Sequence, residues 1–213
     1  EESYHCIKVL RKSIDDEIWC VDGLGNLYNS KLINLDKSQA ILKINYISKN
    51  YGKRNKHIHI AIAPTKNISR LEWCVEKLVE IGIDELTFIV CKNSVRKKIK
   101  FNRIEKIIMS GMKQSLKSYL PILNPIIDFE TFLALDYGYC FKSIGFPNYE
   151  KSVPLIELKD NNSSHLICIG PEGDFTNDEV SLALSNNFEC FTLGNSRLRT
   201  ETAAVVAATI TNL

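Results

Sequence analysis

The order of secondary-structure signals changes near residue 57, and this change constrains the fold more than any other feature of the sequence. Before it, four short segments rich in Ile, Val, Leu, Trp and Tyr follow one another with no helical pattern between them. These predicted strands cover 6–10, 17–22, 27–35 and 39–47. The glycine-rich stretch 22–26 is typical of a tight hairpin turn. We therefore predict a small all-β barrel or curled sheet over residues 1–50, followed by a polar linker over 51–56.

From residue 57 onward, apolar strands alternate with helical patterns. The predicted strands are 58–63, 86–91, 139–144, 166–170 and 190–194. The spacing Ser/Thr/Asn-x-x-Glu, which is typical of a capped helix start, occurs at Ser69, Asn102 and Thr176. This alternation, with continuous hydrophobic strands, predicts an α/β domain over 57–213 in which helices cover both faces of a mostly parallel sheet.

Three helices show where the core of this domain should lie. The first is expected to end at Gly82 and has an apolar face made of Leu71, Cys74, Val75, Leu78 and Val79. The second is expected to close before Pro121, with Ile104, Ile107, Ile108, Met112 and Leu116 at helical spacing. The last, 201–211, is nearly all Ala, Val, Thr and Ile. A helix without a polar face is buried in the core or against another subunit.

Composition narrows the class of protein. No run of eighteen apolar residues suggests a membrane span, and no basic and apolar leader suggests a secretory signal. The seven cysteines form no Cys-x-x-Cys pair, which argues against a zinc site and against a disulfide framework. We therefore expect a reduced, cytoplasmic protein without a metal.

One segment carries a local excess of positive charge. Against the single Glu105, residues 92–106 hold seven basic side chains, which are Lys92, Arg96, Lys97, Lys98, Lys100, Arg103 and Lys106. Such a basic stripe on a nearly neutral chain is either a contact surface for a polyanion or a solvated helix face.

Two strand-to-helix junctions are the candidate sites. In the first, an apolar strand runs into Gly170-Pro171-Glu172-Gly173 and then into the helix that starts at Thr176. In the second, a strand is followed by Gly194, a polar loop and a helix start with Thr200 as the expected N-cap. Ligands bind at the carboxyl ends of strands in open α/β sheets. A tight turn without function is the alternative for the first junction, and a phosphate site or a surface ion pair for the second.

Several common sites are absent from the sequence. It contains no phosphate-binding loop, no dinucleotide-binding glycine motif and no nucleophile elbow. The histidines lack the spacing of metal ligands, so we interpret each as structural or solvated; they are His5, His57, His59 and His165.

Together, the two junctions resemble one family closely. The segment Gly170–Phe175, followed by Leu193-Gly194 and by Leu198-Arg199-Thr200-Glu201-Thr202-Ala203, is similar to the bacterial ribosomal RNA small subunit methyltransferase E family of the SPOUT class. Further similarities are Tyr4-His5, Lys8–Arg11, Lys66, Glu72-Trp73, Lys77, Glu80, Gly82, Gln114-Ser115 and Pro121. Asp174 stands where the family usually has glycine, and Lys117 stands where many members have arginine. Asn195-Ser196-Arg197 replaces a more common Pro-Arg-Ile.

The resemblance implies a fold, a reaction and partners. It implies an N-terminal PUA-like barrel that binds RNA, a deep trefoil knot of a kind that topology rules count as rare, and a homodimer. It also implies S-adenosylmethionine-dependent methylation of N3 of a uridine in 16S ribosomal RNA. The cofactor-binding residues expected from it are Ile169, Gly170, Pro171, Glu172, Gly173, Leu193, Gly194, Leu198, Arg199, Thr200 and Ala203. The expected RNA-binding residues are Arg11, Arg96, Lys97, Lys98, Lys100 and Lys117.

Within this reaction, Arg199 suits the stabilisation of negative charge that develops on the uracil oxygens as N3 loses its proton. Glu201 and Glu172 are both candidates for the base, or for orienting Arg199. Two alternatives stay open: a methyltransferase of the same class that acts on another RNA such as transfer RNA, and a non-catalytic RNA-binding or assembly factor of the same fold.

Overall fold

The computed structural model describes residues 2–36, 39–138, 140–158 and 164–213. Contacts within the chain divide it into two compact units. Unit 1 consists of Glu1–Lys53 and Leu116–Tyr119, and unit 2 consists of Arg54–Ser115 and Leu120–Leu213. In the described part of the chain, no helix combines the length and the apolar character needed to cross a bilayer.

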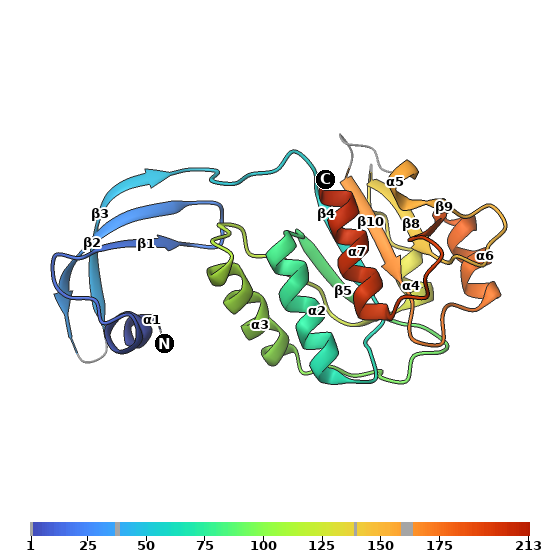
Figure 1. Ribbon diagram of the computed structural model, residues 1–213, viewed down its shortest axis with the longest axis horizontal. Helices are drawn as coiled ribbons and strands as arrows, with labels where there is room; N and C mark the ends of the chain where they lie inside the picture. Colours follow the sequence, from blue (N-terminus) through green and yellow to red (C-terminus); the bar gives the residue numbers. More distant parts are fainter. Residues whose placement is uncertain (1, 37–38, 139, 159–163) are drawn as a thin grey trace. The chain divides into compact units, whose positions relative to one another are not determined.

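Unit 1 contains a three-stranded antiparallel sheet in the order β1-β2-β3 (Figure 1). Its strands are β1 (Glu17–Val21), β2 (Leu27–Leu35) and β3 (Ala40–Ser48). The Asp22 carboxylate fixes the turn between β1 and β2 because it accepts hydrogen bonds from the backbone N–H groups of Leu24 and Asn26, at 2.7 and 3.1 Å. The three predicted strands after residue 16 and the hairpin between the first two of them are confirmed.

The strand predicted over residues 6–10 is wrong. Most of this segment belongs to a π-helical element, η1 (His5–Val9), which follows the short helix α1 (Glu2–Tyr4). Its β-branched residues favoured a strand, but Cys6, Ile7 and Leu10 also have the spacing of one helical face. The backbone N–H of Leu10 donates to the carbonyl of His5 at 3.0 Å, so the turn closes on itself.

Gly25 lies where the two segments of unit 1 contact each other. Gly25 has φ +97°, and its N–H donates to the carbonyl of Ser118 at 2.9 Å. This φ favours glycine, and a Cβ at this position would lie 2.3 Å from Cζ of Tyr119, so a larger residue would also displace that ring.

Unit 2 is built on an eight-stranded sheet in the order β6-β5-β4-β10-β8-β11-β9, with β7 paired to β5. Every strand pair described in this sheet is parallel. The strands are β4 (Ile58–Ile62), β5 (Glu85–Val90), β6 (Ile122–Leu123), β7 (Ile127–Asp128), β8 (Cys140–Gly145), β9 (Val153–Pro154), β10 (Ser164–Ile169) and β11 (Glu189–Thr192). The strand predicted over 139–144 is confirmed, except that its first position, Tyr139, lies outside the described residues.

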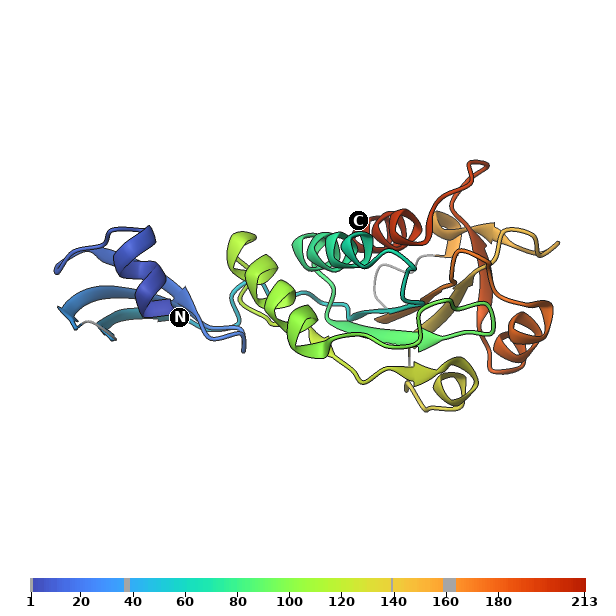
Figure 2. The same ribbon diagram turned by 90° about the horizontal axis from the view of Figure 1, so that it is seen from below.

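Helices lie on both faces of this sheet (Figure 2). On one side are α2 (Ile68–Ile81) and α7 (Thr200–Asn212), and on the other are α4 (Phe129–Leu133) and α6 (Asn177–Ser185). Two further helices are α3 (Phe101–Gln114), which packs on α2, and α5 (Leu155–Leu158). All five residues of β4 are buried, as expected for a strand covered on both faces. The predicted fold class is therefore confirmed.

The predicted core face of α2 is also confirmed. Its buried residues are Leu71, Cys74, Val75, Leu78 and Val79. The helix ends at Gly82, whose φ of +106° suits a glycine C-cap.

Of the three predicted capping boxes, only the one at Thr176 forms. The Thr176 hydroxyl accepts from the N–H of Glu179, and the Glu179 carboxylate accepts from the N–H of Thr176. The capping box predicted at Ser69 does not form, because α2 is capped by Asn67, whose side chain accepts from the N–H of Ser69 at 2.9 Å.

The starts and ends of the other two long helices also differ from the prediction. Asn102 lies inside α3, which begins after Lys100 without a side-chain cap, and Thr200 lies inside α7, whose N-cap is Arg199. Leu116 is not on the buried face of α3, because the helix ends at Gln114.

Within one chain, only one side of the last helix is buried. α7 buries Ala204, Ala207 and Ala208 against its neighbours. Its opposite side is only half-buried or exposed, and carries Thr202, Val205, Val206, Thr209 and Ile210.

We expect Thr176→Ala to lower the free energy of unfolding by about 1 kcal/mol, because it removes the hydroxyl that caps α6. The melting temperature should fall by roughly 2–4 °C for a chain of this size, measured by circular dichroism or calorimetry. Ser69→Ala is the matched control, since Ser69 accepts no capping bond. An equal loss in both variants would show that the cap contributes nothing.

Candidate active site

A cavity of about 480 Å³ opens where β8, β10 and β11 end. Its walls are the loop after β10 and the loop between β11 and α7. The residues that line it are Gly145, Pro147, Ile169, Gly170, Pro171, Glu172, Asp174, Phe191, Thr192, Leu193, Gly194, Ser196, Arg197, Leu198, Arg199, Thr200 and Ala203. All the predicted cofactor-binding residues except Gly173 are among them, so the structure brings the two predicted junctions together into one site.

The loop after β10 is tightly packed. A Cβ on Gly170 would lie 3.0 Å from the ring of Phe175, which in turn packs on Phe129 with ring centroids 4.9 Å apart. Asp174 has φ +63°, in the left-handed region where glycine is most favourable. This conformation favours glycine, which is the residue that the family resemblance implies here, and aspartate tolerates it better than most residues.

The Asp174 carboxyl is partly removed from water. Its Oδ1 accepts a hydrogen bond from the N–H of Phe175 at 2.8 Å. Burial raises its pKa, and this effect outweighs the opposing influence of that hydrogen bond and of the positive charge on Arg197.

The loop after β11 is open by comparison. Gly194 has φ +101° and no atom within 4 Å of the position a Cβ would take. The Thr192 hydroxyl bonds to both backbone groups of Gly194, at 3.1 and 3.2 Å, and holds the turn. The exposed Arg199 lies at the N-cap of α7, and its guanidinium forms no hydrogen bond or ion pair with any described residue.

The two candidate carboxylates are in different surroundings. Glu172 lines the cavity, and its Oε1 accepts from the backbone N–H of Lys66 at 2.8 Å. Glu201 does not line the cavity. Its side chain is buried, and it pairs with Arg70 of α2 at 3.7 Å.

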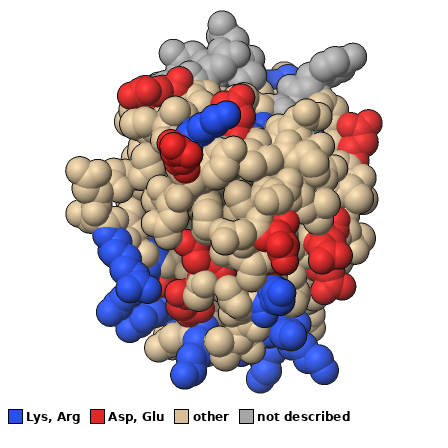
Figure 3. All heavy atoms as spheres, turned by 90° about the vertical axis from the view of Figure 1, so that its right-hand side faces the viewer, with Lys and Arg blue, Asp and Glu red and all other residues tan. Residues whose placement is uncertain are grey.

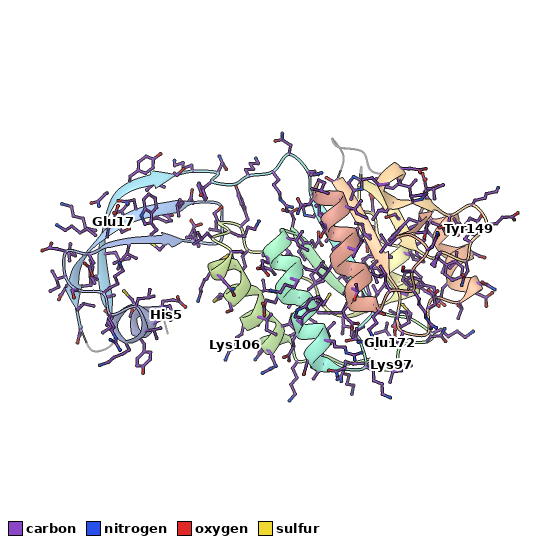
Figure 4. The ribbon with its side chains drawn as sticks, in the orientation of Figure 1. His5, Glu17, Lys97, Lys106, Tyr149 and Glu172 are labelled. Atoms are coloured by element: carbon purple, nitrogen blue, oxygen red, sulfur yellow. The ribbon has the colours of Figure 1, made fainter. Side chains whose placement is uncertain are left out.

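Three of the predicted RNA contacts share one exposed segment. Lys97, Lys98 and Lys100 precede α3, and none of their side chains bonds to another residue that the structure describes. Figure 4 places Lys97 and Glu172 at the same edge of the sheet, and Figure 3 shows Lys and Arg gathered along the lower edge of the face that it draws. Arg96 is different, because its guanidinium donates to the backbone carbonyls of Thr65 and Lys66.

The remaining predicted RNA contacts, Arg11 and Lys117, belong to unit 1. Arg11 is exposed and Lys117 is half-buried.

His59 has a structural environment, as the sequence suggested. It is buried in β4, its Nε2 lies 2.7 Å from the Thr87 hydroxyl, and its ring packs edge-on against Phe132 and Tyr137. Burial lowers its pKa to about 4, so it is neutral at physiological pH. Among the described residues, no group of His, Cys, Asp and Glu side chains is arranged to hold a metal ion.

Comparison with known proteins gives a consistent result. The family model of the RNA methyltransferase domain matches residues 53–212, and that of the RNA methyltransferase PUA domain matches residues 1–45. Ribosomal RNA small subunit methyltransferase E of Mesomycoplasma hyopneumoniae is 32% identical over 83% of this chain and 76% of the relative.

Solved structures agree with these matches. A probable rRNA methyltransferase from Porphyromonas gingivalis is 37% identical, with a TM-score of 0.91 over 97% of this chain and 88% of that one. Ribosomal RNA small subunit methyltransferase E from Neisseria gonorrhoeae, solved with bound S-adenosylmethionine, shares the fold at 24% identity, with a TM-score of 0.88 over 97% and 86% of the two chains.

The fold is therefore that of an RNA methyltransferase domain preceded by a PUA domain. Within that class, the chain belongs to the ribosomal RNA small subunit methyltransferase E family.

We expect Asp174→Asn to raise the melting temperature slightly at pH 7. The amide keeps a side-chain oxygen for the N–H of Phe175 and removes a charge that burial disfavours. Because the folded-state pKa of Asp174 is raised, its ionisation costs stability only as the pH rises above the unfolded value of 3.8. The advantage of the variant should thus shrink as the pH is lowered to 3.8 and below. A difference in melting temperature that is constant with pH would contradict this interpretation.

Proposed function

We propose that this protein transfers a methyl group from S-adenosylmethionine to N3 of a specific uridine in 16S ribosomal RNA of the small subunit. The main support for the proposal is the cavity between the loops that follow β10 and β11. At its edge lies Arg199, which has no ionic partner among the described residues. The curated relatives support ribosomal RNA of the small subunit as the substrate. The ribosomal substrate in turn supports a cytoplasmic location.

The residues of the cavity suit the cofactor. Its volume lies within the usual range for small-molecule sites. Around Gly194 the backbone is open, so a ligand can approach it closely. When bound, S-adenosylmethionine supplies the electrophilic methyl group. Backbone groups from the loops after β10 and β11 would hold it, together with the apolar side chains of Ile169, Leu193 and Leu198.

For this reaction, the chain's own residues have to accept the N3 proton and stabilise the negative charge that develops on the uracil ring. Uridine N3 carries a hydrogen and becomes a nucleophile as that hydrogen leaves, which places negative charge on the neighbouring uracil oxygens. The guanidinium of Arg199 is always charged and donates to such oxygens. Of the two carboxylates, we assign proton acceptance to Glu172, which lines the cavity, and the anchoring of α7 to Glu201, which is held by Arg70.

RNA binding is proposed to involve both units. Lys97, Lys98 and Lys100 offer three positive charges that are unpaired within the described residues. Lys97 lies at the edge of the sheet where the cavity opens (Figure 4). The proposed contacts of unit 1 are Lys117 and Arg11, of which Arg11 lies within the residues that the PUA family model matches. Phosphate contacts of this kind supply affinity without sequence preference, so the choice of uridine rests on the cavity and its loops.

We also propose a homodimer. The outer side of α7 carries Val205, Val206 and Ile210, which are only half-buried within one chain. A second copy would remove these apolar side chains from water.

The first prediction concerns the product and Arg199. Unmodified small subunits incubated with enzyme and cofactor should acquire N3-methyluridine, detected by nucleoside mass and by a reverse-transcription stop, because the methyl group blocks the pairing edge. Arg199→Ala should lower kcat by about 100-fold or more, a far larger effect than its effect on the cofactor Kd, since the charge matters most in the transition state. Arg199→Lys should be intermediate. A methyl group on ribose, on C5 or only on transfer RNA would refute the product, and an unchanged kcat would refute the role of Arg199.

The second prediction concerns the basic segment. Replacing Lys97, Lys98 and Lys100 together by glutamine should weaken RNA binding. It should also reduce the dependence of log K on log salt by roughly 0.7–0.9 for each phosphate that the variant no longer neutralises. Filter binding over a salt series measures both. If affinity and slope stay the same, these lysines form only a solvated face.

The third prediction concerns assembly. Sedimentation equilibrium at micromolar concentration should give about twice the 24.2 kDa chain mass. A fully active species with the mass of one chain would contradict the dimer.

A further inference from the structure

The loop between β5 and α3, residues 91–100, does not line the cavity but contacts the loop that forms one of its walls. The Asn93 amide donates two hydrogen bonds, to the carbonyls of Gly173 and Asp174, each at 3.0 Å. The two loops are so close that a Cβ on Gly173 would lie 3.1 Å from the Cβ of Asn93. Glycine at position 173 thus allows the two loops to pack against each other, and Gly173 does not line the cavity.

The same loop also holds the start of α6. The backbone N–H of Lys92 donates to Oε1 of the buried Glu179 at 2.8 Å, and the other oxygen of Glu179 belongs to the capping box with Thr176. The segment from Gly173 to Glu179 is therefore fixed at both ends by neighbouring residues of the β5–α3 loop.

Arg96 extends these contacts to a third loop. Its Nε donates to the carbonyl of Thr65 at 3.0 Å, and its Nη2 donates to the carbonyl of Lys66 at 2.8 Å. The N–H of Lys66 in turn donates to Glu172, on the wall of the cavity. The Arg96 guanidinium is therefore engaged within the protein, whereas the exposed lysines that follow it form no hydrogen bond to a described residue.

We propose that Asn93 and Arg96 are positioning residues that hold the β10–α6 loop in the shape the cofactor requires. The inference rests on the proposed function, because it assumes that this cavity holds S-adenosylmethionine. Asp174 has a backbone conformation that non-glycine residues adopt rarely, and the Asn93 amide, which donates to the Asp174 carbonyl, is a contact from outside the loop that stabilises it. A loop that is ordered before binding lowers the entropic cost of holding a ligand.

The proposal assigns cofactor affinity and RNA affinity to different residues of the segment 91–100. Asn93 and Arg96 should govern cofactor affinity, whereas Lys97, Lys98 and Lys100 should govern RNA affinity. A contact that positions the loop acts even when RNA is absent, and a phosphate contact does not.

The decisive variant is Asn93→Asp, which keeps the size of the side chain, removes both donors and places a carboxylate against two carbonyl oxygens. We expect the Kd for S-adenosylmethionine, measured by calorimetry, to rise roughly tenfold, which corresponds to losing the net stabilisation of one or two hydrogen bonds. RNA affinity and its salt dependence should change little. Arg96→Lys keeps the charge but cannot reach two carbonyls with one planar group, and it should show the same pattern.

Asn102→Asp is the matched control. It makes the same chemical change on the exposed first turn of α3, where the Asn102 side chain forms no hydrogen bond to a described residue, and it should leave the cofactor Kd unchanged. Hydrogen exchange of the peptide covering 170–176 supplies a readout that needs no ligand. This exchange should be faster in Asn93→Asp than in the wild type and the control. Asn93→Ala, which removes the donors without adding a charge, replaces Asn93→Asp if the latter fails to fold.

Each result has a defined meaning. Unchanged exchange of the 170–176 peptide together with unchanged cofactor affinity in Asn93→Asp would overturn the positioning role. Weaker RNA binding with normal cofactor binding in Arg96→Lys would make Arg96 an RNA contact and overturn its part of the proposal. Faster exchange in Asn93→Asp, in a protein whose wild type binds no S-adenosylmethionine, would support the positioning role and overturn the proposed function instead.

Discussion

The parallel pairing of β4 with β10 is the contact on which the rest of unit 2 depends. It joins the first strand of the domain to one that follows more than half of the domain later, in a continuous register from Ile58 opposite His165 to Ile62 opposite Ile169. Parallel strands end at the same edge of a sheet, so the loops after β4, β10 and β11 are brought together there. The bond between Lys66 and Glu172, which are 106 residues apart in the sequence, is a direct result.

The sequence was informative wherever local pattern and tertiary environment agree. The strands of the parallel sheet are buried on both faces, so they appear as continuous apolar runs, and the apolar face of α2 could be identified residue by residue. The cavity wall was predictable for a similar reason. Each junction is a consecutive stretch of chain, and its glycines mark the places where backbone conformation or close packing excludes a side chain.

Prediction failed where a distant residue competes for a local partner. Ser69 and Glu72 have the spacing of a capping box, but Asn67 caps the helix and Glu72 pairs with Arg103 of α3. Leu116 has the right spacing to continue α3, yet its segment belongs to unit 1. Contacts such as Asn93 with Gly173, 80 residues apart, leave no periodic or compositional signal, and Asn93 was missed for that reason.

The distribution of charge around the cavity separates the residues that build the site from those available to a substrate. Arg70 and Arg96 are both engaged, the first with the buried Glu201 and the second with two backbone carbonyls. The first of these contacts fixes the start of α7 and the second fixes the loop after β4. Arg199 is adjacent to the same helix start but has no partner among the described side chains. Its charge is not offset by an ion pair with any of them, so it would act most strongly on a substrate that gains negative charge during the reaction, as a uracil ring does when N3 loses its proton.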